Sequence, residues 1–199
     1  MTPEEIVEAL KRTIPDLSVE VAPALDQPTL VLTREQIVAA CTALREIPAL
    51  QFVFLSDVAA VDWWPGEPRF QVVYHLASIE HRVRLRLKVP LPGEDAHIPT
   101  VTTVWPGANW LEREVFDLFG IVFDGHPDLR RVLMPEDWEG YPLRKDYPVQ
   151  IKEPVKVYEP LQITPEEFRK KIEDDRQARR HEADHEKADV AEQTKLTGE

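Results

Sequence analysis

The sequence has little of several features that would indicate a particular function. Its 199 residues include one cysteine, Cys41. A single thiol forms no disulfide within the chain and falls short of the four cysteines that usually hold an iron–sulfur cluster. The sequence contains no apolar run of about 18 residues, the length needed to cross a bilayer, and its first residues lack the basic and apolar regions of a signal peptide. We therefore expect a reducing, cytoplasmic location.

Common ligand-binding and catalytic motifs are also missing. The sequence contains no glycine-rich dinucleotide fingerprint, no P-loop, no paired-cysteine motif and no zinc-protease or serine-hydrolase signature. The net charge of −12 is spread along the chain, so no basic footprint for nucleic acid is present. An acidic surface also argues against direct docking on anionic lipid. These absences favour a subunit of an assembly over a free-standing enzyme.

Helix signals are present at four places. Thr2, Thr33 and Thr164 are each followed three residues later by Glu or Gln, the pattern of a capping box. They predict helices over residues 2–13 and 33–47, and a mostly polar helix after residue 164. A further helix is predicted up to residue 119, with Gly120 in the position that ends it. It begins either at Asn109, with Glu112 completing a capping box, or nearer Trp105-Pro106.

Strand signals lie just before the second predicted helix and between it and the helix that ends at residue 119. A short β-rich run covers residues 29–32, and longer runs cover 51–61 and 70–79. Residues 82–89 alternate strictly between basic and aliphatic side chains, which is typical of a half-buried antiparallel strand. Only Glu80 and His81 separate the last two runs, so a tight hairpin is expected. The sequence predicts an α+β fold with a mostly antiparallel sheet packed with helices.

The basic side chains of that last strand form a stripe on one face, namely Arg82, Arg84, Arg86 and Lys88. Such a stripe suits an acidic partner or a phosphate. It equally suits an exposed sheet face whose cations discourage edge-to-edge aggregation.

The region after Gly120 shows no clear periodicity up to residue 163, yet it contains many aromatic and aliphatic side chains. Disordered chains are poor in such residues. We interpret residues 120–163 as an extended, proline-rich C-terminal arm that covers a partner. The predicted organisation is therefore an α+β core domain over 1–119, a partner-binding arm over 120–163 and a polar helical or disordered tail over 164–199.

One polar cluster offers a catalytic alternative. Glu114, Asp117 and His126 are residue types that bind hard metals and transfer protons, and they define the hypothesis of a free-standing metal-dependent hydrolase. The competing interpretation is a solvated helix face with paired charges, followed by a turn. We favour this second interpretation.

A long string of residues is similar to the signature of the C subunit, also called the 30-kilodalton subunit, of respiratory complex I, the NADH-quinone oxidoreductase. The matching stretches are 112–121, Phe123, 125–127, 129–131, 134–140 and 142–148. The similarity extends over residues 51–148 and is looser over the first fifty. Related membrane-bound hydrogenases share part of this signature.

The resemblance implies a component of the peripheral arm of a proton-translocating respiratory complex, on the cytoplasmic side of the bacterial cell membrane. A chain of this family carries no redox centre, so the flavin, the iron–sulfur clusters and the quinone belong to partner subunits. Its chief partner is the D subunit, which helps to form the quinone site, and the arm wraps this neighbour. No catalytic, cofactor-binding or metal-binding residue is expected in the chain itself.

Within the arm, large apolar, aromatic and basic side chains are the expected interface residues, because such side chains carry most interface energy. They are Phe123, Leu129, Arg130, Arg131, Met134, Trp138, Leu143, Arg144, Lys145 and Tyr147. The signature helix contributes Glu112, Arg113, Glu114, Asp117 and Gly120, and the turn after it contributes Gly125, His126 and Pro127.

Overall fold

The computed structural model describes residues 2–24, 26–148, 164–174 and 176. The chain divides into two units, Met1–Val149 and Gln150–Glu199. The elements of the first unit are, in chain order, α1 (Pro3–Thr13), β1 (Val19–Ala22), β2 (Thr29–Leu32), the 3-10 turn η1 (Arg34–Gln36), α2 (Ile37–Glu46), β3 (Phe54–Asp62), β4 (Phe70–Ser78), β5 (Val83–Leu91), β6 (His97–Pro99), α3 (Ala108–Phe119) and β7 (Val122–Asp124). In the second unit, residues 165–174 are helical.

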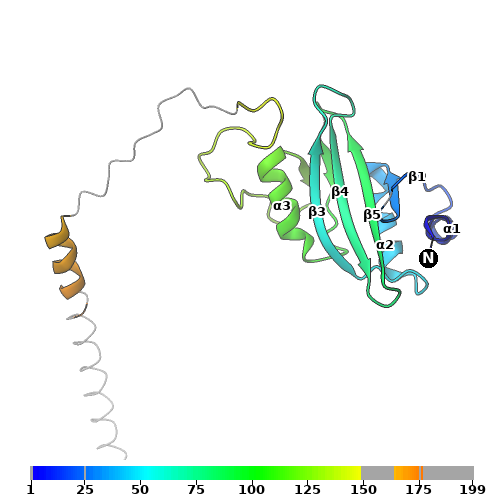
Figure 1. Cartoon of the computed structure of the whole chain (residues 1–199), viewed down its shortest axis with the longest axis horizontal. Helices are drawn as coiled ribbons and strands as arrows, with labels where there is room; N and C mark the ends of the chain where they lie inside the picture. Colours follow the sequence, from blue (N-terminus) through cyan, green and yellow to red (C-terminus); the bar gives the residue numbers. More distant parts are fainter. Residues whose placement is uncertain (1, 25, 149–163, 175, 177–199) are drawn as a thin grey trace, which may run out of the picture. The chain divides into compact units, whose positions relative to one another are not determined.

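Five strands form one sheet in the order β1-β2-β5-β4-β3 (Figure 1). Neighbouring strands are antiparallel except for β2 and β5, which are parallel. The predicted α+β fold with a mostly antiparallel sheet is therefore confirmed. The β4–β5 hairpin is looser than expected, because its last strand pair is Ser78 with Val83. Arg82 lies in the turn with a φ of 52° and is not part of the strand.

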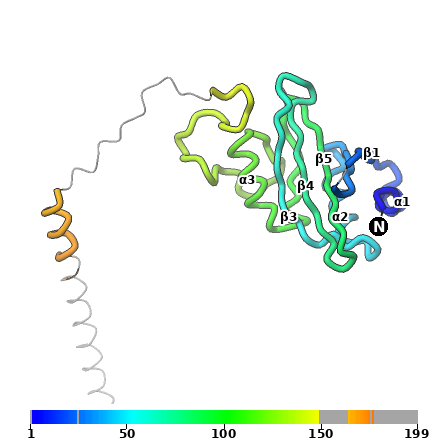
Figure 2. Tube along the Cα trace, in the orientation of Figure 1, coloured from blue at the N-terminus to red at the C-terminus, as the bar shows by residue number. Residues whose placement is uncertain are grey.

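One face of the sheet and two helices enclose the core. The buried side chains of β4 and β5 occupy alternate positions, namely Phe70, Val72, Tyr74, Leu76, Leu85, Leu87, Val89 and Leu91. Tyr74 lies within electrostatic range of Cys41 in α2 and Glu112 in α3. Both helices therefore cover this face, and Figure 2 shows α2 behind the sheet and α3 alongside β3.

The predicted helix starts are confirmed at two of the three threonines. Thr2 and Thr164 each accept a hydrogen bond from the backbone N–H three residues further on. Thr33 makes no such bond, and a 3-10 turn precedes α2. The reason lies in Gln36, whose side chain accepts a hydrogen bond from the N–H of Ser18 and so ties the helix start to the β1 side of the fold.

The core continues past the predicted boundary at residue 119. β7 pairs in parallel with β6, Ile121 is fully buried and Phe123 is 2% exposed. The prediction that Phe123 anchors a partner is therefore wrong, because its ring packs in the core of its own chain. A periodicity analysis misses this strand because it is only three residues long.

Candidate functional site: a polar clamp on helix α3

Helix α3 carries charged side chains that face inward. Glu112 and Asp117 are fully buried and Arg113 is 7% exposed, whereas Glu114 is exposed. The favoured interpretation, a helix face with paired charges, holds for Asp117 as an internal pair with Arg131, but the three buried residues are not solvated. Buried charges need partners inside the protein. Those partners lie in the loop before α3 and in residues 126–148, which we call the return segment.

The start of α3 lies at the second of the two predicted positions, next to Trp105-Pro106. Gly107 and not Asn109 holds the N-cap position, and no side chain caps the helix. Glu112 does not close a capping box. Its carboxyl group accepts hydrogen bonds from the Thr100 hydroxyl at 2.5 Å and the Val101 N–H at 2.8 Å. Glu112 therefore ties α3 to the loop that follows β6.

Burial raises the pKa of Glu112 to about 7, although the hydrogen bonds from Thr100 and Val101 act in the opposite direction. The ring of His126 lies beside it, with 3.9 Å between Nε2 and the Glu112 carboxyl group. His126 Nδ1 accepts a hydrogen bond from the Asp128 N–H, and Nε2 lies 3.1 Å from the Asn109 carbonyl oxygen. With Nδ1 as an acceptor, the ring carries its hydrogen on Nε2.

Asp117 holds the middle of the return segment. One carboxylate oxygen accepts a hydrogen bond from Arg131 at 2.7 Å. The other accepts three backbone N–H groups, those of Val132, Leu133 and Met134, at 2.7–3.0 Å. Burial opposes ionisation, but these donors outweigh it and lower the pKa of Asp117. A single ionised carboxylate thus fixes three consecutive residues against the helix.

Arg113 binds the same stretch from its other side. Its guanidinium donates to the carbonyl oxygens of Arg130 and Arg131, at 3.1 and 3.3 Å, and stacks at 4.8 Å over the ring of Trp110. Arg113 and Asp117 lie four residues apart on one helical face. Together they bind the carbonyl groups of residues 130–131 and the N–H groups of residues 132–134.

The far end of the return segment is held by a carboxylate of the sheet. The buried Asp62, at the end of β3, pairs with Arg69 and accepts the backbone N–H of Lys145 at 2.8 Å. Arg69 also pairs with Asp146 at 2.6 Å. Burial again opposes ionisation of Asp62, and the hydrogen bonds from Arg69 and the backbone outweigh it, so its pKa is lowered.

We call the side chains that hold the return segment, namely Asp62, Arg113, Asp117 and Arg144, the polar clamp. Arg144 binds at the end of α3. Its guanidinium donates to the carbonyl oxygen of Phe119 at 2.6 Å and lies 4.5 Å from the centre of the Tyr141 ring. Gly120 ends the helix with a φ of 70°, as predicted. The same glycine leaves room for the return segment, since a Cβ there would lie 2.6 Å from the Arg144 guanidinium and closer still to the Tyr141 ring.

Gly120→Ala is therefore expected to loosen the clamp. The left-handed backbone costs an L-residue roughly 1–2 kcal/mol, and the added methyl displaces Tyr141 and Arg144. We expect a lower unfolding midpoint and faster trypsin cleavage at Arg144. Gly107→Ala is the matched control, because its backbone is right-handed and a Cβ there meets no described atom within 4 Å. Equal behaviour of the two variants would contradict this role of Gly120.

The structure divides the predicted interface residues into three groups. Arg131 and Arg144 are internal, which corrects the expectation that they pair with a partner: their guanidinium groups bond to Asp117 and to Phe119 of their own chain. Leucine, methionine and aromatic side chains of the second group are half-buried, namely Leu129, Met134, Trp138 and Tyr147. The third group is exposed and consists of Arg130, Leu143 and Lys145.

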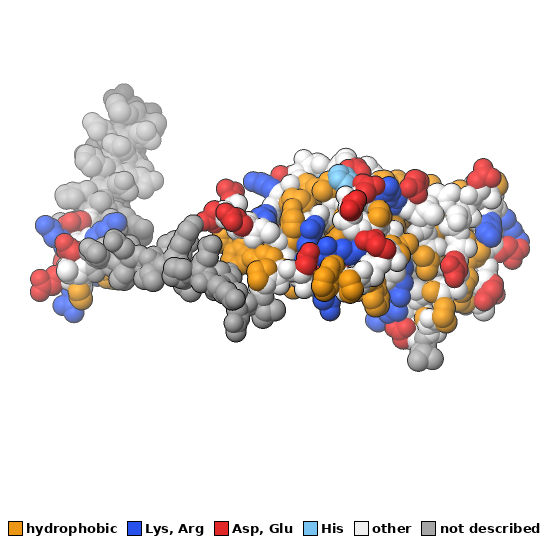
Figure 3. All heavy atoms as spheres, turned by 90° about the horizontal axis from the view of Figure 1, so that it is seen from above, with side chains coloured by type: hydrophobic (Ala, Val, Ile, Leu, Met, Phe, Trp, Pro, Cys, Tyr) orange, Lys and Arg blue, Asp and Glu red, His pale blue; other side chains and the backbone are white. Residues whose placement is uncertain are grey.

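Several exposed apolar side chains were not among the predicted interface residues. Leu133 is 58% exposed, Val132 is 38% exposed, and Trp110 of α3 is 63% exposed. Around residues 132–134 the return segment therefore turns its backbone N–H groups inward to Asp117 and the side chains of Val132 and Leu133 outward. Figure 3 shows hydrophobic side chains lying open at the surface among charged ones. The sequence pattern could not reveal this, because the segment has no regular period.

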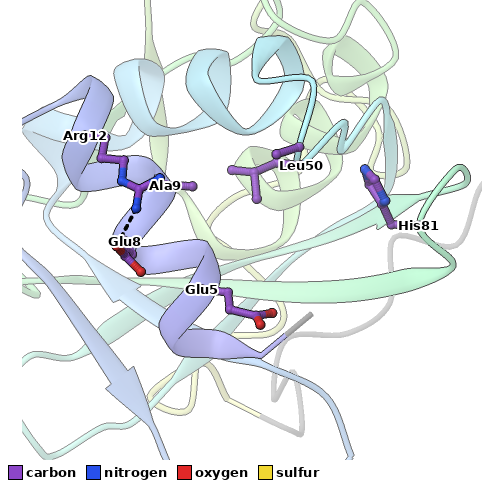
Figure 4. Close-up of a pocket in the computed structure, with 7 residues that line it drawn as sticks. Glu5, Glu8, Ala9, Arg12, Leu50 and His81 are labelled. Carbon is purple, nitrogen blue, oxygen red and sulfur yellow. Dashed lines mark hydrogen bonds and ion pairs between the residues drawn. The ribbon is translucent and has the colours of Figure 1, made fainter.

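The hollows of the surface suggest no catalytic site. The largest of those described, about 500 Å³, lies between α1 and residues 49–50, with His81 at its far side (Figure 4). Its wall includes the ion pair of Glu8 and Arg12 at 2.6 Å. Within the described ranges, no group of three or more His, Cys, Asp or Glu side chains is placed to hold a metal ion.

The three residues of the hydrolase hypothesis do not converge. Asp117 has both oxygens engaged with donors of the return segment, and the His126 nitrogens face backbone groups. Glu114 points to solvent. None of the helices in the described part of the chain is long and apolar enough to span a bilayer.

The fold and the polar clamp together define the class of protein. It is a two-layer α+β domain whose buried charged side chains bind the C-terminal return segment of the same chain. The chain belongs to the family described as "Respiratory-chain NADH dehydrogenase, 30 Kd subunit", whose profile matches residues 30–153. The resemblance to the 30-kilodalton component of complex I is thus confirmed.

Individual relatives agree with this assignment. A protein of Roseiflexus sp. (strain RS-1), named as the C subunit of an NADH-quinone oxidoreductase, is 47% identical over 141 residues, which cover 71% of this chain and 81% of that protein. A solved trypsin-resistant fragment (1–134) of Nqo5 is 38% identical, with a TM-score of 0.52, and covers 65% of this chain and 100% of that fragment.

A second solved structure comes from the membrane-bound sulfane sulfur reductase, an archaeal respiratory membrane complex. The matching chain is 28% identical with a TM-score of 0.60, and the match covers 73% of this chain and 85% of that one. The family thus extends to chains of other multi-subunit respiratory assemblies.

Proposed function

We propose that this chain is a cofactor-free scaffold subunit in the peripheral arm of a proton-translocating NADH-quinone oxidoreductase. In this proposal it supports the D subunit, the partner that forms the quinone site. The flavin, the iron–sulfur clusters and the quinone are carried by partner subunits. The chain is attached to the cytoplasmic side of the cell membrane through those partners.

One observation carries the proposal: the return segment is fixed with the backbone N–H groups of residues 132–134 inward and aliphatic side chains outward. An isolated soluble chain gains nothing by exposing Leu133 at 58% and Leu143 at 51% on a rigidly held segment. A neighbour that covers these side chains gains apolar burial without the entropy cost of ordering the segment, because Asp117 and Asp62 have already ordered it.

The test is Leu133→Ala combined with Leu143→Ala. Because both side chains are exposed, the free energy of unfolding should change by less than about 0.5 kcal/mol. Loss of two interface anchors should weaken binding to the D subunit about 10- to 30-fold, measured by co-purification and by titration with that partner. Val21→Ala, at an exposed position of β1, is the matched control. Unchanged affinity in the double variant would count against the proposal.

A second candidate is the same scaffold role in another membrane-bound respiratory complex, such as a hydrogenase-type assembly. The 28% identity and TM-score of 0.60 to a chain of the sulfane sulfur reductase complex favour it. Mass spectrometry of the proteins that co-purify with the full-length chain separates the two, because only the first assembly contains the NADH-oxidising flavoprotein.

A further inference from the structure

The second face of the five-stranded sheet has no helix on it within the described part of the chain. In Figure 1 the strands β3, β4 and β5 cross the front of the molecule, and α2 lies behind them. On this face the loop before β2 contacts His75 through Gln27 and Arg86 through Asp26. This open face presents the residues that alternate with the core positions: Asp57, Ala59 and Val61 of β3, Gln71, Val73, His75 and Ala77 of β4, and Arg84, Arg86 and Lys88 of β5.

Small side chains make the middle of the open face flat. Val73 of β4 stands directly between Ala59 of β3 and Lys88 of β5. It is 7% exposed although no described helix covers it. Ala77 stands next to Arg84 in the same way. A flat, partly apolar surface of this kind allows a partner to approach closely.

The cations of the open face are not all neutralised by their own chain. Arg86 pairs with Asp26 at 2.7 Å. Arg84 and Lys88 have no hydrogen-bond or ion-pair partner among the described residues, and they lie on a chain whose net charge is −12. Two unneutralised cations on an otherwise acidic protein favour an acidic partner over further basic surfaces.

The geometry also selects the form of the partner. The strands β4 and β5 lie inside the sheet, so their backbone groups are already paired and a new strand cannot join them. Alternate residues of a strand are about 6.7 Å apart, and residues four apart on a helix are separated by about 6 Å. Carboxylates at helix positions i and i+8, about 12 Å apart, would therefore lie opposite Arg84 and Lys88, which are about 13 Å apart along β5.

We propose that the open face is covered by an acidic helix of another subunit of the assembly, which turns the two-layer domain into a three-layer one. This rests on the proposed function and adds a second contact surface, separate from the return segment. A second copy of this chain fits poorly, because a two-fold pairing would bring the same cations face to face. Lipid or nucleic-acid phosphate is disfavoured by the net charge of the chain.

Thiol labelling of the assembled complex tests this surface. The native Cys41 is fully buried, and burial raises its pKa well above the usual range, so the wild type gives little background. Ala77→Cys should react with maleimide in the free chain and about tenfold or more slowly in the complex. Glu4→Cys, at an exposed position on α1, is the control and should react equally in both.

A photocrosslinker attached to the introduced thiol identifies what covers the face. A link to a helical segment of another subunit with acidic residues at eight-residue spacing supports the proposal. Links to a second copy of the chain or to lipid overturn it, and so does unchanged reactivity in a complex that still contains the chain. Failure to co-purify with any respiratory partner would overturn the proposed function as well.

Charge reversal gives an independent readout. Arg84→Glu with Lys88→Glu should lower co-purification of the linked partner about tenfold, and the loss should shrink as salt is raised and screens the wild-type attraction. Lys11→Glu, an exposed reversal on α1, is the control. Arg84→Lys and Lys88→Arg keep the charge and should retain the partner. A double reversal that binds as well as the control would overturn the proposal.

Discussion

Asp117→Ala is expected to lower the free energy of unfolding by about 3 kcal/mol, the low end for breaking a buried ion pair. The change strands the Arg131 guanidinium and leaves three backbone N–H groups without their acceptor. For a chain of 199 residues this corresponds to a midpoint roughly 6–12 °C lower. Thermal unfolding followed by calorimetry measures it.

Glu114→Ala is the control for this prediction. It removes a carboxylate from the same helix at an exposed position, and a change within about 0.5 kcal/mol is expected. The pH dependence adds a second check. Because the pKa of Asp117 is lowered in the folded state, its stabilisation is present above the unfolded pKa and is lost as pH falls through the folded pKa. The difference in the free energy of unfolding between wild type and Asp117→Ala should therefore shrink in acid. A difference that stays constant with pH would contradict the role of an ionised Asp117.

The regular elements were predictable because local patterns agree with the fold. The alternation along β5 placed Leu85, Leu87 and Val89 on one face, and the structure buries all three. Gly120 was recognised as the residue that ends α3, because glycine has no side chain and readily adopts the left-handed backbone of this position. Thr33 shows the limit of such reasoning, since a tertiary contact of Gln36 replaced the expected cap.

The polar clamp was not predictable from composition or periodicity. From the sequence alone, a carboxylate such as Asp117 is interpreted as a solvated charge unless its partners are known. Its partners Val132 to Met134 lie 15–17 residues further along the chain, so no local pattern connects them. Because every residue except proline has a backbone N–H group, the sequence does not indicate which of these groups bind a carboxylate. One signal was available in the sequence. The charged residues Glu112, Arg113 and Asp117 lie in a helix that also carries apolar side chains, and they belong to the signature string on which the family resemblance depends.

The sequence left open whether the arm after residue 119 is ordered without a neighbour, and the structure answers this for residues 126–148. Backbone and side-chain hydrogen bonds to Asp62, Arg113 and Asp117 hold residues 126–148 on their own unit. Residues 149–163, the remainder of the predicted arm, and most of the predicted tail lie outside the described residues. A partner subunit that binds residues 126–148 would therefore meet a preordered surface and not a flexible segment.

Glu112→Gln is expected to remove a pH dependence of stability. Burial raises the pKa of Glu112 from 4.5 to about 7 in the folded chain. Between those values the folded state holds a proton that the unfolded state has lost, so stability is full below about pH 4.5 and falls as pH rises toward 7. The integrated loss is on the order of 3 kcal/mol. Glutamine stays neutral throughout and should abolish this part of the slope.

Denaturant unfolding of both chains at several pH values between 4.5 and 8 measures the difference directly, because all other titrating groups are common to the two. The variant should match the wild type near pH 5 and exceed it above pH 7. Glu114→Gln, which makes the same change at the exposed neighbour, should follow the wild type at every pH. Parallel profiles for wild type and Glu112→Gln would mean that Glu112 is ionised when buried, and that the Thr100 and Val101 donors outweigh its desolvation. The domain would then rest on three buried ionised carboxylates, those of Asp62, Glu112 and Asp117, and loss of a proton from Glu112 would not be what weakens the contact of α3 with the loop after β6.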